Sequence, residues 1–172
     1  MLVAVRHGQT DWNVEERFQG HLDIPLNIAG IDQARALKSR LACIPFDAAY
    51  SSPLKRALQT ASLVGTETGY DSKIMISEAL SPAASVAAFE KLVGDLNEHE
   101  NVLVVGHNPN LAQFLGALLS PSRVNIRLRK GAIARVDATR RPGILHWLVD
   151  PRILRGVYSN VTKSSRRKTS RK

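Results

Sequence analysis

The stretch LVAVRHGQTDWN, residues 2–13, decides the fold, because an apolar run passes directly into an arginine, a histidine and a glycine. Residues 2–5 are too few for a helix and contain β-branched valines, so they predict a short buried β-strand. Arg6 and His7 then lie where that strand ends. Two interpretations are open at this point: a solvated strand terminus, or a nucleophile and an anion-binding group at the mouth of a sheet.

The rest of the chain alternates between strand and helix patterns. Strands are predicted at 47–50, 73–76, 101–107, 131–137 and 144–149, and residues 11–26 predict a long loop. Helices are predicted at 27–41 with Asn27 as N-cap, from Ser52 and Pro53 to Gly65 or Gly69, at 82–96, and from Asn108 through Leu119. This alternation predicts an α/β fold, with three α/β/α layers and a mostly parallel central sheet.

The two most apolar strands both run into a histidine, His7 in the first and His107 in the second. Ligands of open α/β sheets bind beyond the carboxyl ends of the strands, so we expect both histidines to face one site. Arg56, one turn into the helix after strand 47–50, can reach back over the end of that strand. Glu78 follows strand 73–76 by two residues, again at a carboxyl end.

The residue types in this set distinguish two kinds of site. Two histidines and a carboxylate could bind zinc. Arg6 and Arg56 argue against a metal, because a guanidinium group stays protonated and repels a cation. Two guanidinium groups suit the oxygens of a phosphoryl group instead. The sequence therefore predicts a phosphate site that needs no metal or other cofactor.

Each residue of the set has an expected role in phosphoryl transfer. His7 is the predicted nucleophile, because a neutral imidazole can attack phosphorus through one nitrogen while a hydrogen bond holds the other. Arg6, Arg56 and His107 would stabilise negative charge on the phosphoryl oxygens. Glu78 would protonate the leaving group and then activate water. Asn13 would add a neutral hydrogen-bond donor to the phosphate, or would be a plain turn residue.

Three motifs in this order resemble those of the histidine phosphatase (phosphoglycerate mutase-like) superfamily. RHGQTDWN (6–13) is similar to its signature, SSPLKRALQTA (51–61) to its second block, and VVGHNP (104–109) to its third. The segment PLNIAGIDQA (25–34) is similar to the one before its first helix. The resemblance implies a phosphoglycerate mutase-like fold, a phosphohistidine intermediate on His7, and no metal requirement.

The resemblance points to two substrate classes. Residues 79–101 form only a short segment where many mutases and broad phosphatases of this superfamily carry a lid-forming insertion, so this part resembles the compact SixA-type phosphohistidine phosphatases. RHGQTDWN and RFQGHLDIPLN (17–27) are more similar to the small-molecule branch. We expect hydrolysis of protein phosphohistidine at an open crevice above His7. The alternatives are a phosphatase of sugar or nucleotide phosphates and a mutase-like enzyme.

Length and charge set the domain organisation. The chain has 172 residues and a net charge of +9, and we expect a single domain over residues 1–158. Residues 159–172 carry six Lys and Arg side chains and no acid, which predicts a disordered, solubilising tail. This tail has no aromatic residue for base stacking, so we do not expect nucleic acid as a partner.

Composition also predicts where the protein works. No apolar run approaches the roughly 20 residues of a membrane span. The first strand begins at residue 2, which leaves no room for a secretory signal before it, and Cys43 is the single cysteine. We therefore expect a cytoplasmic protein with no membrane partner, whose partner is a phosphorylated protein or a small phosphorylated substrate. A phosphate-binding module without turnover is the non-enzymatic alternative, and an intact nucleophile at His7 argues against it.

Overall fold

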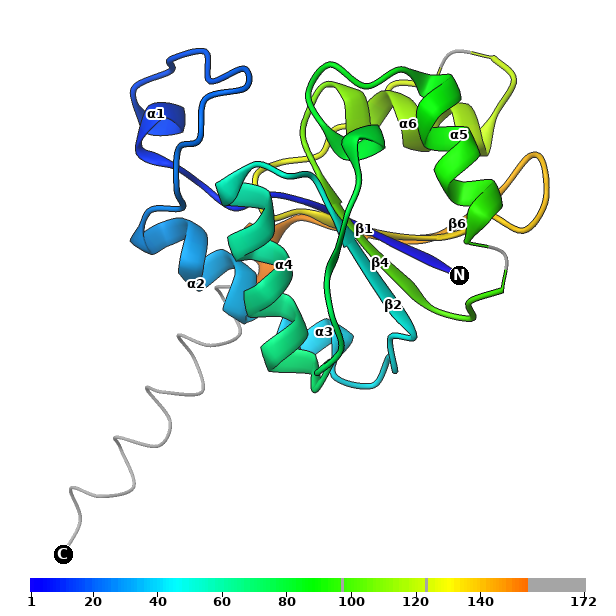
Figure 1. Cartoon of the computed structure of the whole chain (residues 1–172), viewed down its shortest axis with the longest axis horizontal. Coiled ribbons are helices and arrows are strands. Elements are labelled where there is room, and N and C mark those ends of the chain that lie inside the picture. The colour runs from blue at the N-terminus through cyan, green and yellow to red at the C-terminus, as the bar shows by residue number, and fades with distance from the viewer. Residues whose placement is uncertain (97, 123, 155–172) are drawn as a thin grey trace, which may run out of the picture.

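The computed structural model describes residues 1–96, 98–122 and 124–154, in which one six-stranded sheet lies between two layers of helices (Figure 1). The strands are β1 (Leu2–Arg6), β2 (Ala48–Ser51), β3 (Met75–Ile76), β4 (Val102–Gly106), β5 (Ile133–Asp137) and β6 (Ile144–Val149). The helices are α1 (Asp11–Val14), α2 (Ile28–Ala36), α3 (Lys38–Leu41), α4 (Lys55–Thr68), the 3₁₀ helix η1 (Glu78–Leu80), α5 (Val86–Asp95) and α6 (Asn110–Leu119). The predicted α/β/α layering is confirmed.

The sheet has the order β3-β2-β4-β1-β5-β6. Strands β1, β2, β3 and β4 run parallel to one another. At one edge, β5 pairs antiparallel with β1, and β6 pairs antiparallel with β5. The predicted mostly parallel sheet is confirmed. In the register of β1 and β4, Arg6 pairs with Gly106. The next residue of each strand is a histidine, so His7 and His107 leave the same edge of the sheet side by side.

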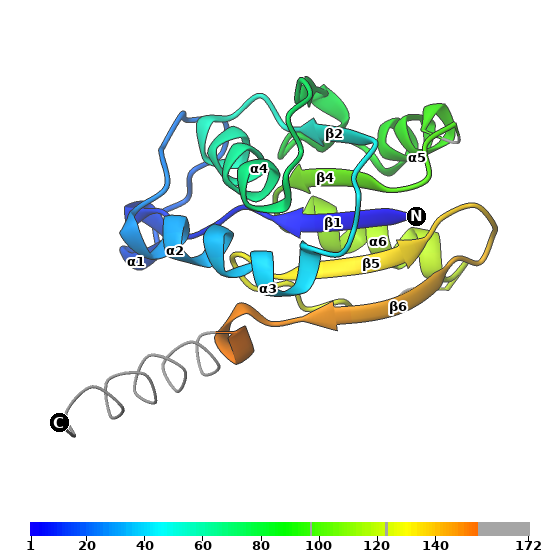
Figure 2. The same cartoon turned by 90° about the horizontal axis from the view of Figure 1, so that it is seen from below.

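Alternate residues of the strands build two cores. Helices α2, α3 and α4 cover one face, where Val3 and Val5 of β1 are fully buried, and α5 and α6 cover the other, where Ala4 is buried (Figure 2). Strand β1 is therefore apolar on both sides, as expected for a central strand. On the α5 and α6 side, Phe89 stacks on Phe114 with ring centroids 4.5 Å apart.

Two segments differ from the sequence prediction. The expected loop over residues 11–26 contains α1, which begins at a capping box between Thr10 and Asn13. The expected helix over 27–41 begins as predicted, with the Asn27 side chain accepting from the Gly30 N–H, but it is divided into α2 and α3 at Leu37. The Leu37 side chain is fully buried, so the break keeps this residue in the core.

Helix α4 begins two residues later than Ser52 and Pro53 predict. The Ser52 hydroxyl accepts only a long hydrogen bond, 3.3 Å, from the Leu54 N–H. Leu54 is still extended, and the first helical N–H, that of Lys55, donates to the Asp23 carboxylate at 2.6 Å. A side chain from the preceding loop thus caps α4, and Gly69 ends it in the left-handed conformation, φ 78°.

The other predicted elements are present with shifted ends. The predicted strand 73–76 pairs with β2 only at Met75 and Ile76, and the predicted helix 82–96 begins at Val86, after its N-cap Ser85. Among the described residues, no helix has the length and apolar character needed to cross a membrane. The predicted tail at 159–172 and the domain boundary at 158 lie outside the described residues and stay predictions.

Candidate active site

The two predicted histidines lie against each other at the carboxyl edge of the parallel strands. The ring centroids of His7 and His107 are 5.0 Å apart, and the rings are tilted by 52°. Both side chains are almost completely buried, with 4% and 3% of their surface exposed. A solvated strand terminus is therefore the wrong interpretation of Arg6 and His7.

A hydrogen bond fixes the ring orientation of His7. Its Nδ1 lies 2.7 Å from the carbonyl oxygen of Gly8. A carbonyl oxygen can only accept, so Nδ1 carries the proton and Nε2 keeps its lone pair. Gly8 is held in turn by its N–H, which donates to the Thr60 hydroxyl at 3.1 Å. A Cβ atom at Gly8 would lie 2.6 Å from the carbonyl oxygen of Gly30, so only glycine fits beside this nucleophile.

His107 is held by a side chain from the neighbouring strand. Its Nε2 lies 2.8 Å from the Ser52 hydroxyl, just after β2. Its Nδ1 is buried and has no hydrogen-bond partner within the described part of the chain. The ring therefore keeps one buried polar atom without a partner in these residues.

The two arginines bring positive charge to both histidines, and both are anchored to backbone carbonyls. Arg6 donates to the carbonyl oxygen of Leu128 at 2.8 Å. Arg56, only 2% exposed, donates to the carbonyl oxygens of Gly20 and Leu22 at 2.8 and 2.7 Å. The Thr60 hydroxyl that receives the Gly8 N–H donates to the Arg56 carbonyl oxygen at 2.7 Å, which ties α4 to the nucleophile loop.

Glu78 lies on η1, at the carboxyl end of β3, but it stands apart from the other predicted residues. Its side chain is exposed, and its carboxylate accepts from the Ser81 hydroxyl at 2.6 Å. Helix η1 packs on the end of β4, since a Cβ atom at Gly106 would lie 3.3 Å from the carbonyl oxygen of Leu80. Glu78 is thus at the correct edge of the sheet, and its carboxylate makes no hydrogen bond to His7, His107, Arg6 or Arg56 in the described residues.

Asn13 helps to cap α1, whereas the sequence predicted either a phosphate contact or a plain turn residue. Its side-chain oxygen accepts from the Thr10 N–H at 3.2 Å, and its own N–H donates to the Thr10 hydroxyl. This reciprocal pair starts α1. The amide nitrogen of the Asn13 side chain stays available for the predicted contact with phosphate.

Arg56 also holds the loop after α1, because it donates to the carbonyl oxygens of Gly20 and Leu22. Sequence reasoning did not foresee this contact. In the segment 79–101, α5 lies against α6, where Phe89 stacks on Phe114. Both histidines are almost completely buried, and the expected open crevice above His7 stays a prediction.

Burial keeps both histidines neutral. Burial lowers the pKa of His7 to about 3, helped by the charges of Arg56 and Arg6 and opposed by the hydrogen bond to Gly8. Burial likewise lowers the pKa of His107 to about 2, with the charges of His7 and the two arginines acting in the same direction. His7 is therefore uncharged at neutral pH, which is the form that the predicted nucleophilic role requires.

We expect the ring ¹⁵N signals of His7 and His107 to keep the pattern of neutral imidazole from pH 7 down to pH 5, with the proton of His7 on Nδ1. The unfolded chain binds these two protons near pH 6.5, whereas the folded protein binds the proton of His7 only near pH 3 and that of His107 only near pH 2. The folded state should therefore lose stability as pH falls from 6.5 toward 3. Titration of either ring with a midpoint near 6.5 would contradict the burial argument.

Sequence reasoning missed the residues that support the histidines and arginines. Thr60 lies one helical turn after Arg56, and this spacing could have identified it. Ser52 was interpreted as a helix cap, whereas its hydroxyl contacts His107. Within the described ranges, no group of three or more His, Cys, Asp or Glu residues is placed to hold a metal ion.

Comparison with known proteins agrees with this geometry. Residues 2–81 match the model of the histidine phosphatase superfamily (branch 1). The protein histidine phosphatase SixA, solved with tungstate, superposes with a TM-score of 0.76 at 26% identity, over 89% of this chain and 98% of that one. Residues 2–81 are thus similar to the histidine phosphatase superfamily, and the described chain shares the fold of SixA over most of its length.

Two of the curated relatives share higher sequence identity over shorter stretches. The chain is 46% identical to phosphoglycerate mutase-like protein 4 of Arabidopsis thaliana over 69 residues. These residues make up 40% of this chain and 30% of that protein. The chain is 47% identical over 64 residues to 2,3-bisphosphoglycerate-dependent phosphoglycerate mutase 2 of Gloeobacter violaceus, which is 37% of this chain and 29% of that protein. Each match thus spans less than a third of the relative's length and less than half of this chain.

Proposed function

We propose that this protein is a phosphatase that removes phosphate from phosphohistidine on another protein, through a covalent phosphohistidine on its own His7. The observation that carries the proposal is the orientation of His7, whose Nδ1–H is held by the Gly8 carbonyl so that Nε2 can attack phosphorus. The attack forms the Nε2–P bond and breaks the bond between phosphorus and the leaving group. Water then attacks the same phosphorus, releases phosphate and frees Nε2.

Charge in the site suits the transferred group. The phosphoryl oxygens gain negative charge in the transition state, and Arg6 and Arg56 supply positive charge beside the nucleophile. The buried Nδ1 of His107 has no partner in the described residues, and a phosphoryl oxygen or its proton would give it one. In the proposed role, Glu78 donates a proton to the leaving group and then takes one from water.

Two observations favour a protein-borne substrate. The segment 79–101 packs on the sheet through α5 and adds no lid, and the SixA structure superposes over nearly its whole length. A different observation favours small phosphoesters as the second candidate. Sequence identities of 46% and 47% are found with a phosphoglycerate mutase-like protein and a phosphoglycerate mutase, and the two histidines are deeply buried, as suits a small substrate.

A direct competition tests the substrate class. We expect kcat/KM to be higher for a phosphohistidine protein than for a panel of sugar and nucleotide monophosphates. The phosphorus–nitrogen bond of phosphohistidine is labile, whereas an ester needs remote binding energy to reach the transition state. A higher kcat/KM for one phosphoester would instead establish the second candidate.

The same panel tests Glu78. Glu78→Gln should slow ester hydrolysis by about 10²-fold, the lower end for general acid catalysis, since an alkoxide leaving group needs a proton. Hydrolysis of phosphohistidine should fall by much less. Glu90→Gln is the matched control, because Glu90 is exposed on α5 and outside the site. Equal losses on both substrates would show that Glu78 does not act as the leaving-group acid.

A further inference from the structure

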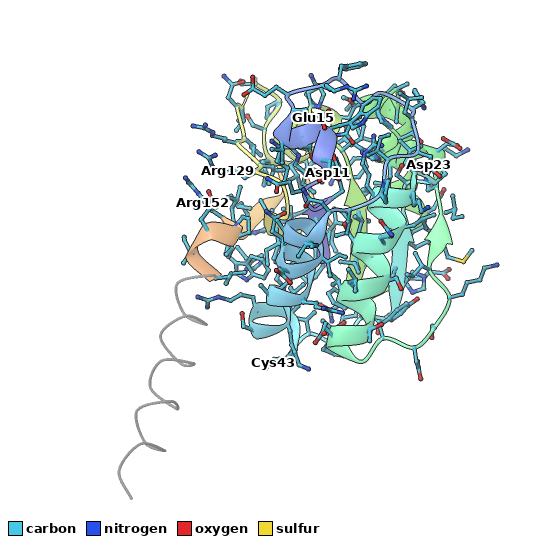
Figure 3. The ribbon with its side chains drawn as sticks, turned by 90° about the vertical axis from the view of Figure 1, so that its left-hand side faces the viewer. Asp11, Glu15, Asp23, Cys43, Arg129 and Arg152 are labelled. Carbon is cyan, nitrogen blue, oxygen red and sulfur yellow. The ribbon has the colours of Figure 1, made fainter. Side chains whose placement is uncertain are left out.

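A groove of about 530 Å³ opens beside Arg6 and continues away from the two histidines. We call it the basic groove, after the five cationic side chains that line it: Arg6, Arg127, Arg129, Lys130 and Arg152. They come from the end of β1, from the segment before β5, and from the turn after β6. Figure 3 shows Arg129 and Arg152 close together on this side of the molecule. Gln9 and Asn108 add neutral hydrogen-bonding groups to the walls.

Positive charge in the basic groove exceeds negative charge. One carboxylate, Asp150, contacts two of the cations, Arg129 at 3.1 Å and Arg152 at 2.8 Å. Arg127 and Lys130 form no ion pair in the described residues. Residues 97, 123 and 155–172, which the structure does not describe, include no Asp or Glu that could pair with them. The groove therefore attracts anions.

Hydrogen bonds hold the basic groove in a fixed position next to the nucleophile. The N–H of Gly131 donates to the carbonyl oxygens of both Arg6 and His7 at 3.1 Å. Arg6 and Asn108 both donate to the carbonyl oxygen of Leu128, at 2.8 and 2.9 Å. The charge of Lys130 also contributes to the lowered pKa of His7, which agrees with its position at the inner end of the groove.

The cations spread from the wall of the groove to its rim. Arg6 lies at the inner end, whereas Arg127 is exposed and the Arg152 side chain is 68% exposed. Charges spread in this way suit several carboxylates on an extended surface better than one compact anion.

We propose that the basic groove binds carboxylates on the protein that carries the phosphohistidine, so the substrate protein has an acidic surface beside its phosphorylated histidine. This inference rests on the proposed function and names the kind of partner that the site accepts. The groove would contact parts of the partner that do not react. It would therefore affect how selectively and how fast the two proteins associate, and not the rate of the chemical step.

Two peptides with the same central phosphohistidine, one flanked by Asp and Glu and the other by Asn and Gln, test the proposal. At low salt, kcat/KM of the full-length wild-type protein should be at least ~10-fold higher for the acidic peptide, the lower end of electrostatic steering, and added NaCl should reduce this ratio. The double variant Arg127→Glu/Arg152→Glu should abolish or invert the ratio. For each preparation, kcat/KM on the peptides is divided by its rate of phosphoramidate hydrolysis, which corrects for the content of active protein.

Arg40→Glu is the matched control, because Arg40 is an exposed arginine on α3. Figure 3 shows Cys43, which follows α3, at the far end of the molecule from Asp11 and Arg129. This variant makes a charge change of the same kind away from the groove. It should keep the wild-type preference for the acidic peptide.

Three outcomes would overturn the proposal, and they are distinguishable. If the wild-type protein hydrolyses both peptides at equal rates, the proposal of an acidic partner is wrong and the proposed function still stands. No hydrolysis of either peptide, together with hydrolysis of phosphoesters, would remove the proposed function itself. The third outcome has three parts: the wild-type protein prefers a sugar bisphosphate to its monophosphate, the double variant loses this preference, and neither peptide is preferred. This outcome would show that the groove binds a second phosphate group.

Discussion

His7→Ala should reduce turnover by on the order of 10⁴-fold or more on every substrate, as expected when a covalent nucleophile is removed. The wild-type protein, quenched during turnover, should carry phosphate that is stable in alkali and lost in acid. The Nδ1 of His7 donates to Gly8, so this phosphate should be attached to Nε2. Phosphorus NMR of the denatured phosphoprotein distinguishes the two ring positions.

His146→Ala is the matched control, because His146 is an exposed histidine on β6. It should keep wild-type turnover and the phosphorylated intermediate. His7 is buried, so the circular dichroism of His7→Ala must match that of the wild type before its activity is interpreted. A folded His7→Ala protein that still hydrolyses phosphoesters at near the wild-type rate would refute the covalent mechanism.

Arg56→Ala should lower kcat by about 10²–10³-fold, the effect of removing one preorganised group that stabilises transition-state charge. A second effect follows from the structure. The same guanidinium group holds the carbonyl oxygens of Gly20 and Leu22, so its loss releases the loop after α1 from α4. Trypsin should therefore cleave this variant after Arg17 faster than it cleaves the wild type.

Two further variants separate charge from hydrogen-bond geometry. Arg56→Lys keeps the charge but cannot donate to two carbonyl oxygens in the same fork, so it should restore part of the rate and little of the protease resistance. Lys55→Ala is the matched control, because the Lys55 side chain is exposed on the residue of α4 just before Arg56. Wild-type kcat in Arg56→Ala would show that this arginine serves only the loop.

The layered fold and the meeting of His7 with His107 were predictable, because they follow from patterns within single strands. Two runs of valine and leucine each end in a histidine, and parallel neighbours bring equivalent ends together. The antiparallel edge was not predicted. The segments at 131–137 and 144–149 have the same apolar character as parallel strands, and the direction of a strand is set by its connections rather than by its composition.

The environment of the site was much less predictable, because it depends on contacts between distant segments. Asp23 caps α4 from 32 positions away, and Arg56 reaches back to Gly20 across 36 positions. No local spacing encodes such pairs. For Glu78, the position after β3 was predictable from the local sequence. The environment of its side chain was not, because the sequence does not show that the carboxylate is exposed and accepts from the Ser81 hydroxyl. The charged groove beside Arg6 also required three separate segments to be placed together.

The antiparallel edge of the sheet has a consequence for how this protein can diversify. The nucleophile and its phosphate-binding partners come from the parallel strands and α4, whereas most cations of the basic groove come from the segment before β5 and the turn after β6. Substitutions at Arg127, Arg129 or Arg152 leave the β1 and β4 register untouched. On the proposed function, such substitutions would change in gradual steps which acidic protein surface the groove binds, and would leave the residues proposed for phosphoryl transfer unchanged.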